Sequence, residues 1–549
     1  MTDSTVHIGT TPLTLDELVA VARRHSRVAL SPEAAQRLAA SREWLESVVD
    51  GTQDGLQDPI YSVNTGFGSL AGRQAFADPS DAAELSRRLV LSNTVGVGRH
   101  VDEEVVRAAM LIRAVSLLVG HSAVRPVVVN TLVEMLNAGV HPAVPEYGSL
   151  GASGDLIPLA HVAIVMSKPG DGPDDPLDSG EAWLGGKIVT GVEAMKSAGI
   201  DRIALGAKEG LALLNGTSFS CAQVALALHD AENLLATNQI TAAMTIEALR
   251  GFGDAFIAEL HAARGQRGQI EVAARLRELL ADADLVDGDR DRNPTRQPPQ
   301  DAYSLRCVPQ VLGPVKDTLA FVHGIVENEM NAATDNPLVF PGLPRPLKAV
   351  SGGNFHAEYL AFAADFLSIV VTEIGSITER RLFRLDDGTL NRGLPDMLVP
   401  SEQVGMDCGY MLPQYLCAAL VSDCKTLAHP DSVDSIPTCA NQEDHVSMAN
   451  NAGRHARQVV TNIEVVVAVE LLMATQALDL RVKQGEVDEY GLSTAARAVR
   501  ALVRSDRAAD GRTLSYLKQD VVLYPWVRRA TELVHDGAVV DAVTAEERA

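Results

Sequence analysis

A glycine-rich segment at residues 148–155, Gly-Ser-Leu-Gly-Ala-Ser-Gly-Asp, is where residue types and spacing first suggest chemistry. It leads into an apolar stretch at 156–165 that is typical of a helix. Because helix N-termini attract anions, a phosphate loop is one interpretation. The segment lacks the lysine of the P-loop and a ribose-binding acid in a βαβ setting, which disfavours that interpretation. A plain glycine turn before a helix is the alternative.

Five further segments, together with the triplet Ala152-Ser153-Gly154, resemble motifs of the aromatic amino acid ammonia-lyase and aminomutase family. They are spread over most of the chain in the family's order, and the last two are similar to its histidine-type branch. The segments are 61–68 (YSVNTGFG), 214–217 (LNGT), 300–307 (QDAYSLRC), 351–356 (SGGNFH) and 435–445 (SIPT followed by NQEDH). Six matches in order favour membership over coincidence.

The resemblance implies that the triplet cyclises autocatalytically to 4-methylideneimidazol-5-one (MIO), with no metal or diffusible cofactor. Gly154 offers an unhindered backbone nitrogen that can reach the carbonyl carbon of Ala152. Ser153 carries a β-hydroxyl whose loss leaves an exocyclic methylidene, and the small Ala152 lets the strained turn close. The product is an electrophile, which ordinary side chains do not provide.

The resemblance also implies roles for side chains outside the triplet. Tyr61, as a phenolate, is the candidate base for the β-hydrogen, and we expect its pKa to be lowered by positive potential such as that of helix N-termini. Arg306 presents a planar fork that can hold the substrate carboxylate by two hydrogen bonds. Without the resemblance, a loop tyrosine would be interpreted as a surface residue and the arginine as a salt-bridge partner.

Four more residues complete the expected site. Tyr303, Asn215 and Gln300 can donate hydrogen bonds to the amine and to the prosthetic ring oxygen, which stabilises developing charge. Phe355 is expected to pack against the prosthetic group or the substrate ring, although a plain core position fits it as well.

Two positions depart from the histidine-type pattern and bear on the substrate. Asn93 stands where histidine and tyrosine lyases commonly carry histidine. Asp423 stands where histidine ammonia-lyases carry a glutamate, so its carboxylate reaches less far. A buried amide and carboxylate still favour a substrate with a polar side chain over phenylalanine, because unpaired buried polar groups are costly.

The reaction type has three interpretations. An ammonia-lyase releases ammonia and the α,β-unsaturated acid from an aromatic or histidine-like L-amino acid, and the histidine-type motifs favour it. A 2,3-aminomutase would return the amine to the β-carbon, depending on how long lid loops near Tyr61 and near 287–301 stay closed. A non-catalytic helical scaffold is the third, and the intact triplet, Tyr61, Tyr303 and Arg306 disfavour it.

The histidines give no sign of a metal site in the sequence. His161, His356, His429 and His445 show neither an HExxH motif nor clustered ligand spacing. We therefore interpret them as hydrogen-bonded structural histidines and predict no bound metal.

Helical patterns dominate the elements that must position these residues. Thr14 to Glu17 reads as a capping box, and Ser31-Pro32 reads as an N-cap followed by a first-turn proline. Long apolar-periodic stretches, several of them longer than 25 residues, indicate a bundle of long helices. They lie near 208–250, 301–332, 354–390 and 444–482. A short hairpin is expected within 183–195.

We predict a mostly α fold in three consecutive portions. Residues 1–205 form an N-terminal portion with the tyrosine loop and the triplet, 206–480 form a central long-helix bundle, and 481–549 form a C-terminal helical tail. The proline-broken, charged segment 287–301 is expected to be a mobile loop. The resemblance implies a homotetramer whose sites are each built from three subunits.

Composition limits the partners and the compartment. The 549 residues carry a formal net charge of −24 and are 46% hydrophobic, which is typical of an ordinary globular protein. Because so acidic a surface repels phosphate backbones, we expect a small amino acid as partner and no nucleic acid. Six cysteines without a CxxC pair, no secretory signal and no clean 18-residue apolar run predict a cytoplasmic protein without a membrane span.

Overall fold

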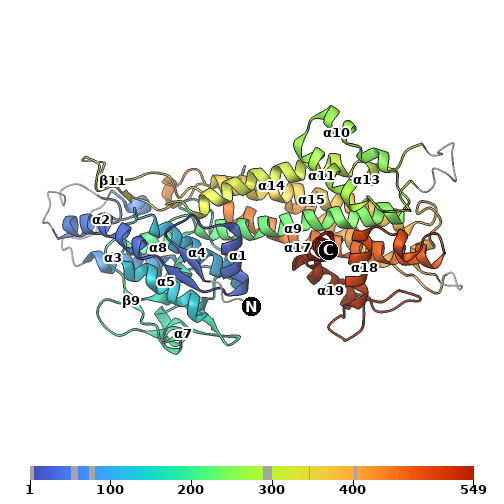
Figure 1. The fold of residues 1–549 in the computed structure, drawn as a ribbon. Coiled ribbons are helices and arrows are strands. Elements are labelled where there is room, and N and C mark those ends of the chain that lie inside the picture. Colours follow the sequence, from blue (N-terminus) through green and yellow to red (C-terminus); the bar gives the residue numbers. More distant parts are fainter. Residues whose placement is uncertain are drawn as a thin grey trace. The chain divides into compact units, whose positions relative to one another are not determined.

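The computed structural model describes residues 5–50, 60–72, 81–287, 299–344, 347–400 and 405–548. Within these ranges the chain is mostly helical, as predicted, and its short strands pair in small sheets (Figure 1). Two compact units share the chain discontinuously. Unit 1 comprises 1–226, 323–365 and 430–454, and unit 2 comprises 227–322, 366–429 and 455–549. The three consecutive portions expected from the sequence are a different kind of division and stay a prediction.

Unit 1 contains most of the shorter elements. Its helices are α1 (Leu15–Arg24), α2 (Pro32–Val49), α3 (Asp81–Asn93), α4 (Glu103–Leu118), α5 (Pro126–Ala138), α6 (Leu156–Met166), α7 (Gly191–Ala198) and α8 (Glu209–Leu214). Its strands are β1 (Val6–Ile8), β2 (Val28–Leu30), β3 (Val97–His100), β4 (His141–Pro142), β5 (Pro145–Tyr147), β6 (Ser167–Lys168), β7 (Glu181–Leu184), β8 (Lys187–Thr190), β9 (Ile203–Ala204), β10 (Leu338–Val339) and β11 (Ala349–Val350).

Four long helices contribute residues to both units, and shorter helices complete unit 2. The long helices are α9 (Ser218–Ala248), α14 (Val308–Met330), α15 (Glu358–Asp386) and α17 (Ala449–Lys483). Unit 2 adds α10 (Ala258–Arg264), α11 (Arg267–Leu279), α13 (Tyr303–Arg306), α16 (Met411–Leu427), α18 (Thr494–Ser505), α19 (Tyr524–His535) and α20 (Ala538–Glu547).

The strands form two-stranded pairs and one three-stranded sheet. β1 pairs with β2 and β6 with β9 in parallel, whereas β3–β5 and β10–β11 are antiparallel. The three-stranded sheet has the order β4–β7–β8, with His141 opposite Trp183 and Trp183 opposite Ile188. Because each sheet is this small, the helices supply nearly all of the core.

Two helix starts follow the sequence signals. Thr14 caps α1: its hydroxyl accepts a hydrogen bond from the Glu17 backbone N–H, and its own backbone N–H donates to the Glu17 carboxylate. Ser31 caps α2, which begins at Pro32. His25 follows the last residue of α1 and adopts the left-handed conformation that usually favours glycine or asparagine (φ 54°).

Two sequence expectations need correction. The hairpin expected within 183–195 is present as β7 and β8, but β8 ends at Thr190, whose hydroxyl caps α7. The helix expected over 208–250 is divided into α8 and α9 by a break at Asn215–Thr217, where Gly216 has φ 132°. That break turns Asn215 out of helical geometry and makes it available to the site.

α15 is the one helix among the described residues that is long and apolar enough to cross a membrane by length and composition. Its most apolar 18-residue window has a mean hydropathy of 1.7, and 67% of that window is buried within the protein. A core helix of a globular protein passes the same test, so we interpret α15 as part of the core.

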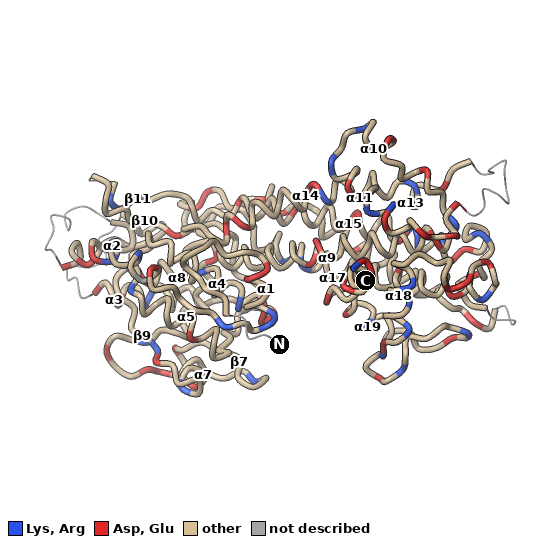
Figure 2. Tube along the Cα trace, in the orientation of Figure 1, with Lys and Arg blue, Asp and Glu red and all other residues tan. Residues whose placement is uncertain are grey.

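Unit 2 encloses a charged pair in its apolar interior. Arg381 and Glu470 are both fully buried, and Arg381 Nη2 donates to Glu470 Oε2 over 2.9 Å. Thr241, Thr245 and Asn238 donate three further hydrogen bonds to the same carboxylate, at 2.6, 3.1 and 3.2 Å. Other charges are interspersed in sign along both units rather than gathered in one block (Figure 2).

Candidate active site

The triplet lies in a turn that ends at α6 and is held against the start of α9. Gly154 has φ 71°, and a Cβ there would stand 2.2 Å from the Gly216 carbonyl oxygen, so only glycine fits. The backbone of Asp155 donates to that same oxygen over 2.8 Å. The buried Asp155 carboxylate accepts hydrogen bonds from the Phe219 and Ser220 backbones at 2.9 and 2.7 Å. Burial raises the pKa of this carboxyl group in spite of these hydrogen bonds.

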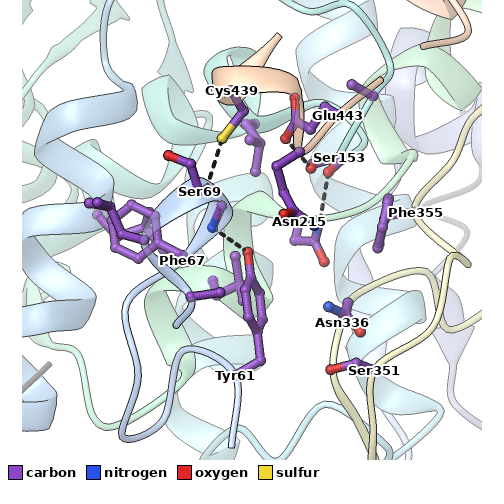
Figure 3. A pocket seen from close by; sticks show the side chains of 18 of the residues that line it. Tyr61, Phe67, Ser69, Ser153, Asn215, Asn336, Ser351, Phe355, Cys439 and Glu443 are labelled. Atoms are coloured by element: carbon purple, nitrogen blue, oxygen red, sulfur yellow. Dashed lines mark hydrogen bonds between the residues drawn. The ribbon is translucent and has the colours of Figure 1, made fainter. Parts of the chain in front are cut away.

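Ser153 is held by two side chains from distant segments. The Asn215 amide donates to the Ser153 carbonyl oxygen over 2.6 Å, and the Ser153 hydroxyl donates to Glu443 Oε1 over 2.6 Å (Figure 3). Thr438 Oγ1 donates to the other carboxylate oxygen of Glu443 over 2.8 Å, which fixes its orientation. Both ends of Ser153, the backbone carbonyl and the β-hydroxyl, are therefore positioned.

Tyr61 lies on a loop of the same unit. Its hydroxyl accepts a hydrogen bond from the Gly68 backbone N–H over 2.8 Å (Figure 3). The expectation that its pKa is lowered is wrong for this structure. Burial raises the pKa of Tyr61, and the nearby Cys439 and Glu443 raise it further, whereas the single hydrogen bond from Gly68 opposes them.

These residues line one cavity of about 700 Å³ within unit 1. Of the residues expected from the sequence, it brings together Tyr61, Asn93, Ser153, Asn215 and Phe355, along with Ala152. Phe67 and Phe355 flank the polar groups (Figure 3). A cavity of this size, with a few convergent polar groups, suits a small organic ligand. None of the described residues that line it is a lysine or an arginine.

Glu443 lines the cavity although the sequence analysis gives it no role of its own. It belongs to the NQEDH motif, and its contact with Ser153 joins positions 290 residues apart, which sequence spacing does not reveal. Cys439 and Asn336 also line the cavity without having been expected there. Ser69 donates its backbone N–H to the Cys439 thiol over 3.2 Å (Figure 3).

The QDAYSLR residues lie elsewhere, in unit 2. Gln300, Tyr303 and Arg306 line a separate cavity of about 550 Å³, and the Tyr303 side chain is exposed. The Arg306 guanidinium lies 4.7 Å from the centre of the Tyr303 ring, and its Nε donates to the Asp301 carbonyl oxygen over 2.8 Å. Within unit 2 this segment therefore presents an aromatic ring and a cation side by side. The lid expected near 287–301 falls largely on 288–298, outside the described residues.

The two substrate-tuning positions differ in their placement. Asn93 lines the cavity of unit 1 and donates from Nδ2 to the Leu89 carbonyl oxygen over 2.8 Å. Asp423 lies on α16 in unit 2, where Asn462 donates to it over 3.3 Å, and it does not line that cavity. Asn93 is thus the departure that bears directly on this pocket.

Two histidines at the cavity lie closer together than their sequence spacing indicates. The rings of His356 and His445 are stacked with centres 5.3 Å apart, and His445 Nδ1 lies 3.2 Å from His356 Nε2. The Glu358 carboxylate lies 3.9 Å from the other nitrogen of His356. The two histidines are hydrogen-bonded as expected, and the absence of a bound metal stays a prediction.

The residues of the triplet fit a cyclised group. The left-handed turn at Gly154 presses its backbone against Gly216, where no side chain fits, and the Ser153 hydroxyl opens onto the cavity. Asn215 would hold the group through the Ser153 carbonyl oxygen, and Asn215 Oδ1 is buried without a hydrogen-bond partner among the described residues. This oxygen is therefore available to accept a hydrogen bond from an N–H group of a ligand.

Comparisons with known proteins agree with this geometry. A family model described as aromatic amino acid lyase matches residues 13–505. The chain is 44% identical to a histidine ammonia-lyase of Clostridium tetani, over 97% of this chain and 96% of that protein. Its structure resembles histidine ammonia-lyase from Trypanosoma cruzi, with a TM-score of 0.85 and 36% identity over 99% and 96% of the two chains. It also resembles tyrosine aminomutase from Streptomyces globisporus, with a TM-score of 0.88 and 33% identity over 99% of each chain.

Proposed function

The chain belongs to the aromatic amino acid lyase family and is an ammonia-lyase, and we propose that its substrate is an L-amino acid with a polar, histidine-like ring. The observation that carries this proposal is the convergence of Ser153, Asn215, Glu443 and Tyr61 on one cavity. The polar side chains of that cavity would be left unpaired by a phenyl ring, which favours a ring with its own hydrogen-bonding atoms.

The family is the MIO-dependent class, and we propose that Ala152-Ser153-Gly154 forms this group here. The Gly154 nitrogen bonds to the Ala152 carbonyl carbon with loss of one water, and Ser153 loses its β-hydroxyl as a second water. The cyclised triplet supplies an electrophilic methylidene carbon. The intact mass of the purified protein tests this, because a cyclised chain weighs two waters less than its sequence. Ser153→Ala is expected to keep its full mass and its assembly but lose all turnover.

The residues around the triplet have separate tasks. Asn215 stabilises negative charge on the Ser153 carbonyl oxygen through its short hydrogen bond. Tyr61 takes the β-hydrogen as a proton on its hydroxyl oxygen, which requires the phenolate. Glu443 accepts the hydroxyl hydrogen of Ser153 and later offers a carboxylate to the substrate amine. Phe355 provides an apolar wall for the substrate ring.

The carboxylate of an amino acid needs a cation that this cavity lacks among its described lining residues. We propose that Tyr303, Arg306 and Gln300 of another copy complete each site in a homotetramer. Tyr303 is 72% exposed in the single chain, although the family resemblance assigns it to the site. Arg306 would supply the carboxylate fork, and its positive charge would oppose the rise in the pKa of Tyr61 that burial causes.

Large exposed aromatic side chains support self-association. Phe321 on α14 is 56% exposed, and Tyr359 and Phe362 on α15 are 71% and 42% exposed, which leaves large apolar rings open to solvent. Combining two variants in one tetramer tests the shared site. Tyr61→Phe and Tyr303→Phe are each expected to be inactive when expressed alone. When the two chains are co-expressed, they are expected to regain part of the activity. No recovery in mixed tetramers, with both variants folded, would refute a site built from several copies.

The substrate is tested by incubating purified enzyme with pooled histidine, tyrosine and phenylalanine and identifying the products by mass spectrometry. We expect ammonia and an unsaturated acid from a polar-ring amino acid. Asn93 is the residue of the cavity that should influence the choice, whereas Asp423 is not among the residues that line it. Turnover of phenylalanine far above that of histidine and tyrosine would refute the substrate proposal.

A 2,3-aminomutase is the second candidate, because a tyrosine aminomutase shares this fold. The same incubation separates the two reactions. A β-amino acid of unchanged mass, without free ammonia, would identify the aminomutase.

We further propose that the enzyme works in the cytoplasm and needs no metal, diffusible cofactor, membrane or nucleic acid for turnover. Its acidity and its free cysteines support this proposal.

A further inference from the structure

Two histidines and a glutamate from three separate stretches of unit 1 meet at its surface. His25 follows α1, Glu103 begins α4, and His141 begins β4. Glu103 Oε1 lies 3.1 Å from His141 Nε2 and 3.4 Å from His25 Nε2, and one ligand atom from each residue lies within 4.8 Å of the other two. We propose that these three side chains bind a zinc-class divalent cation, at a site separate from the cavity that holds Ser153.

The ligand set and the spacing suit Zn²⁺. Two imidazoles and one carboxylate form a known type of zinc site that leaves the fourth position to water. With metal–ligand distances of about 2.0–2.2 Å, tetrahedral ligand atoms lie about 3.3 Å apart. The two separations from Glu103 Oε1, 3.1 and 3.4 Å, already match this value. The third edge joins the two histidines, and because His25 is exposed, a small rotation of its side chain can bring its ring nitrogen closer to His141.

His141 is a prepared ligand because its ring is mostly buried beside Glu103. Its Nδ1 is buried and has no hydrogen-bond partner among the described residues. One ring nitrogen therefore stays unpaired whichever tautomer is present. Moving the proton to Nδ1 to free Nε2 for a metal costs no existing hydrogen bond at Nδ1.

The charges around the site decide how strongly it binds. Arg107 opposes a cation, but its guanidinium is held by the Val21 carbonyl at 3.0 and 2.8 Å and the Leu136 carbonyl at 3.1 Å. The Glu103 carboxylate supplies the negative charge that offsets it. A bound ion would connect the end of α1, the start of α4 and the start of β4.

The three residues are far apart in the chain, so no spacing motif pointed to them. This site departs from the sequence-based prediction of no metal, and it does not depend on the proposed function. It also leaves the reaction unchanged, since none of the three side chains lines the active-site cavity.

The test is calorimetric titration of the metal-stripped full-length protein with ZnCl₂. Two variants remove a ligand with little risk to folding: His25→Gly, because glycine suits the left-handed φ of 54°, and Glu103→Gln, which keeps its length. His100→Ala is the matched control, because His100 lies 4.0 Å from Glu181 and its ring contacts Trp183, and it is not one of the three proposed ligands. Circular dichroism of each variant confirms that it is folded.

We expect each ligand variant to bind one Zn²⁺ fewer per chain than wild type and His100→Ala, or to bind that ion at least about tenfold more weakly. Zn²⁺ should raise the unfolding temperature of wild type and of His100→Ala but not of the two ligand variants. Co²⁺ in place of Zn²⁺ should give the visible absorption of a tetrahedral site only where all three ligands are present. Equal zinc stoichiometry and affinity in wild type and both variants, or no zinc bound by wild type, would overturn the proposal. Ammonia release in the same samples tests the proposed function separately, and His25→Gly should retain it.

Discussion

Replacing Asn215 by alanine tests the charge stabilisation on which the proposed reaction depends. The Asn215 amide donates a 2.6 Å hydrogen bond to the Ser153 carbonyl oxygen. The cyclised triplet would supply an electrophile whose developing negative charge falls on that oxygen. A donor placed at this atom therefore stabilises the transition state more than the ground state.

The expected size of the effect follows from this geometry. Removing one well-placed donor to a developing oxyanion costs about 2.7–4 kcal/mol, which corresponds to a roughly 10²–10³-fold lower kcat. The backbone should change little, because the Asn215 N–H still donates to the Leu211 carbonyl oxygen over 2.8 Å. Asn215→Ala should therefore lower kcat strongly and the substrate KM only modestly.

The assay is the ultraviolet absorption of the unsaturated acid, with intact mass measured on the same samples. The mass separates a failure to cyclise from slow turnover by chains that have lost two waters. Asn137→Ala is a matched control, because its amide makes two hydrogen bonds to Val28, at 2.8 and 2.9 Å, away from the cavity. A cyclised Asn215→Ala protein with kcat within threefold of wild type would refute the assigned role.

Three other predictions address cyclisation, proton removal and stability. Gly154→Ala should keep its full sequence mass and be inactive, because its Cβ would stand 2.2 Å from a backbone oxygen. Gly324→Ala, which has open space around its Cβ, is the control and should be active. A Gly154→Ala protein that has lost two waters would contradict this prediction. The pKa of Tyr61 is raised above its usual value of 10, so the phenolate fraction, and with it kcat/KM, should still rise as the pH increases above neutrality. If Tyr61→Phe shows the same pH profile as wild type, Tyr61 is not the base. Burial raises the pKa of Glu247 from 4.5 to about 7, so the folded state binds more protons between these values and loses about 3 kcal/mol of stability as pH rises through them. Glu247→Gln should flatten that decline in unfolding midpoints measured from pH 5 to 8, and an unchanged slope would show that Glu247 is not its source.

Local features were predictable where local chemistry decides them. The capping box at Thr14, the N-cap at Ser31 and the helix after the triplet follow from neighbouring residues, and each is present. The break between α8 and α9 was missed because apolar periodicity continues on both sides of it. Its cause is Gly216, whose close approach to Gly154 involves two segments far apart in the chain.

The sequence predicts several residues of the site, but it does not predict how they interact with one another. Motif resemblance identified Tyr61, Ser153 and Asn215, and the structure places all three at one cavity. It could not give the direction of the Tyr61 pKa, because that direction depends on how much surrounding protein replaces water. It also gave no role to Glu443, whose meaning depends on a contact across 290 residues of chain.

The buried pair of Arg381 and Glu470 has a consequence for the uniqueness of the fold rather than for its stability. Helices lined with alanine, leucine and valine can pack almost equally well after sliding by one turn, about 5.4 Å. Such a slide would separate Glu470 from Arg381 and from the three side chains that donate to it, leaving a charge unpaired in an apolar interior. A buried pair contributes little net stability compared with apolar residues of equal size, but breaking it costs about 3–5 kcal/mol. This polar cluster therefore fixes the register of α9, α15 and α17 in unit 2. Alignments shifted by one turn are higher in free energy because they separate the buried charges.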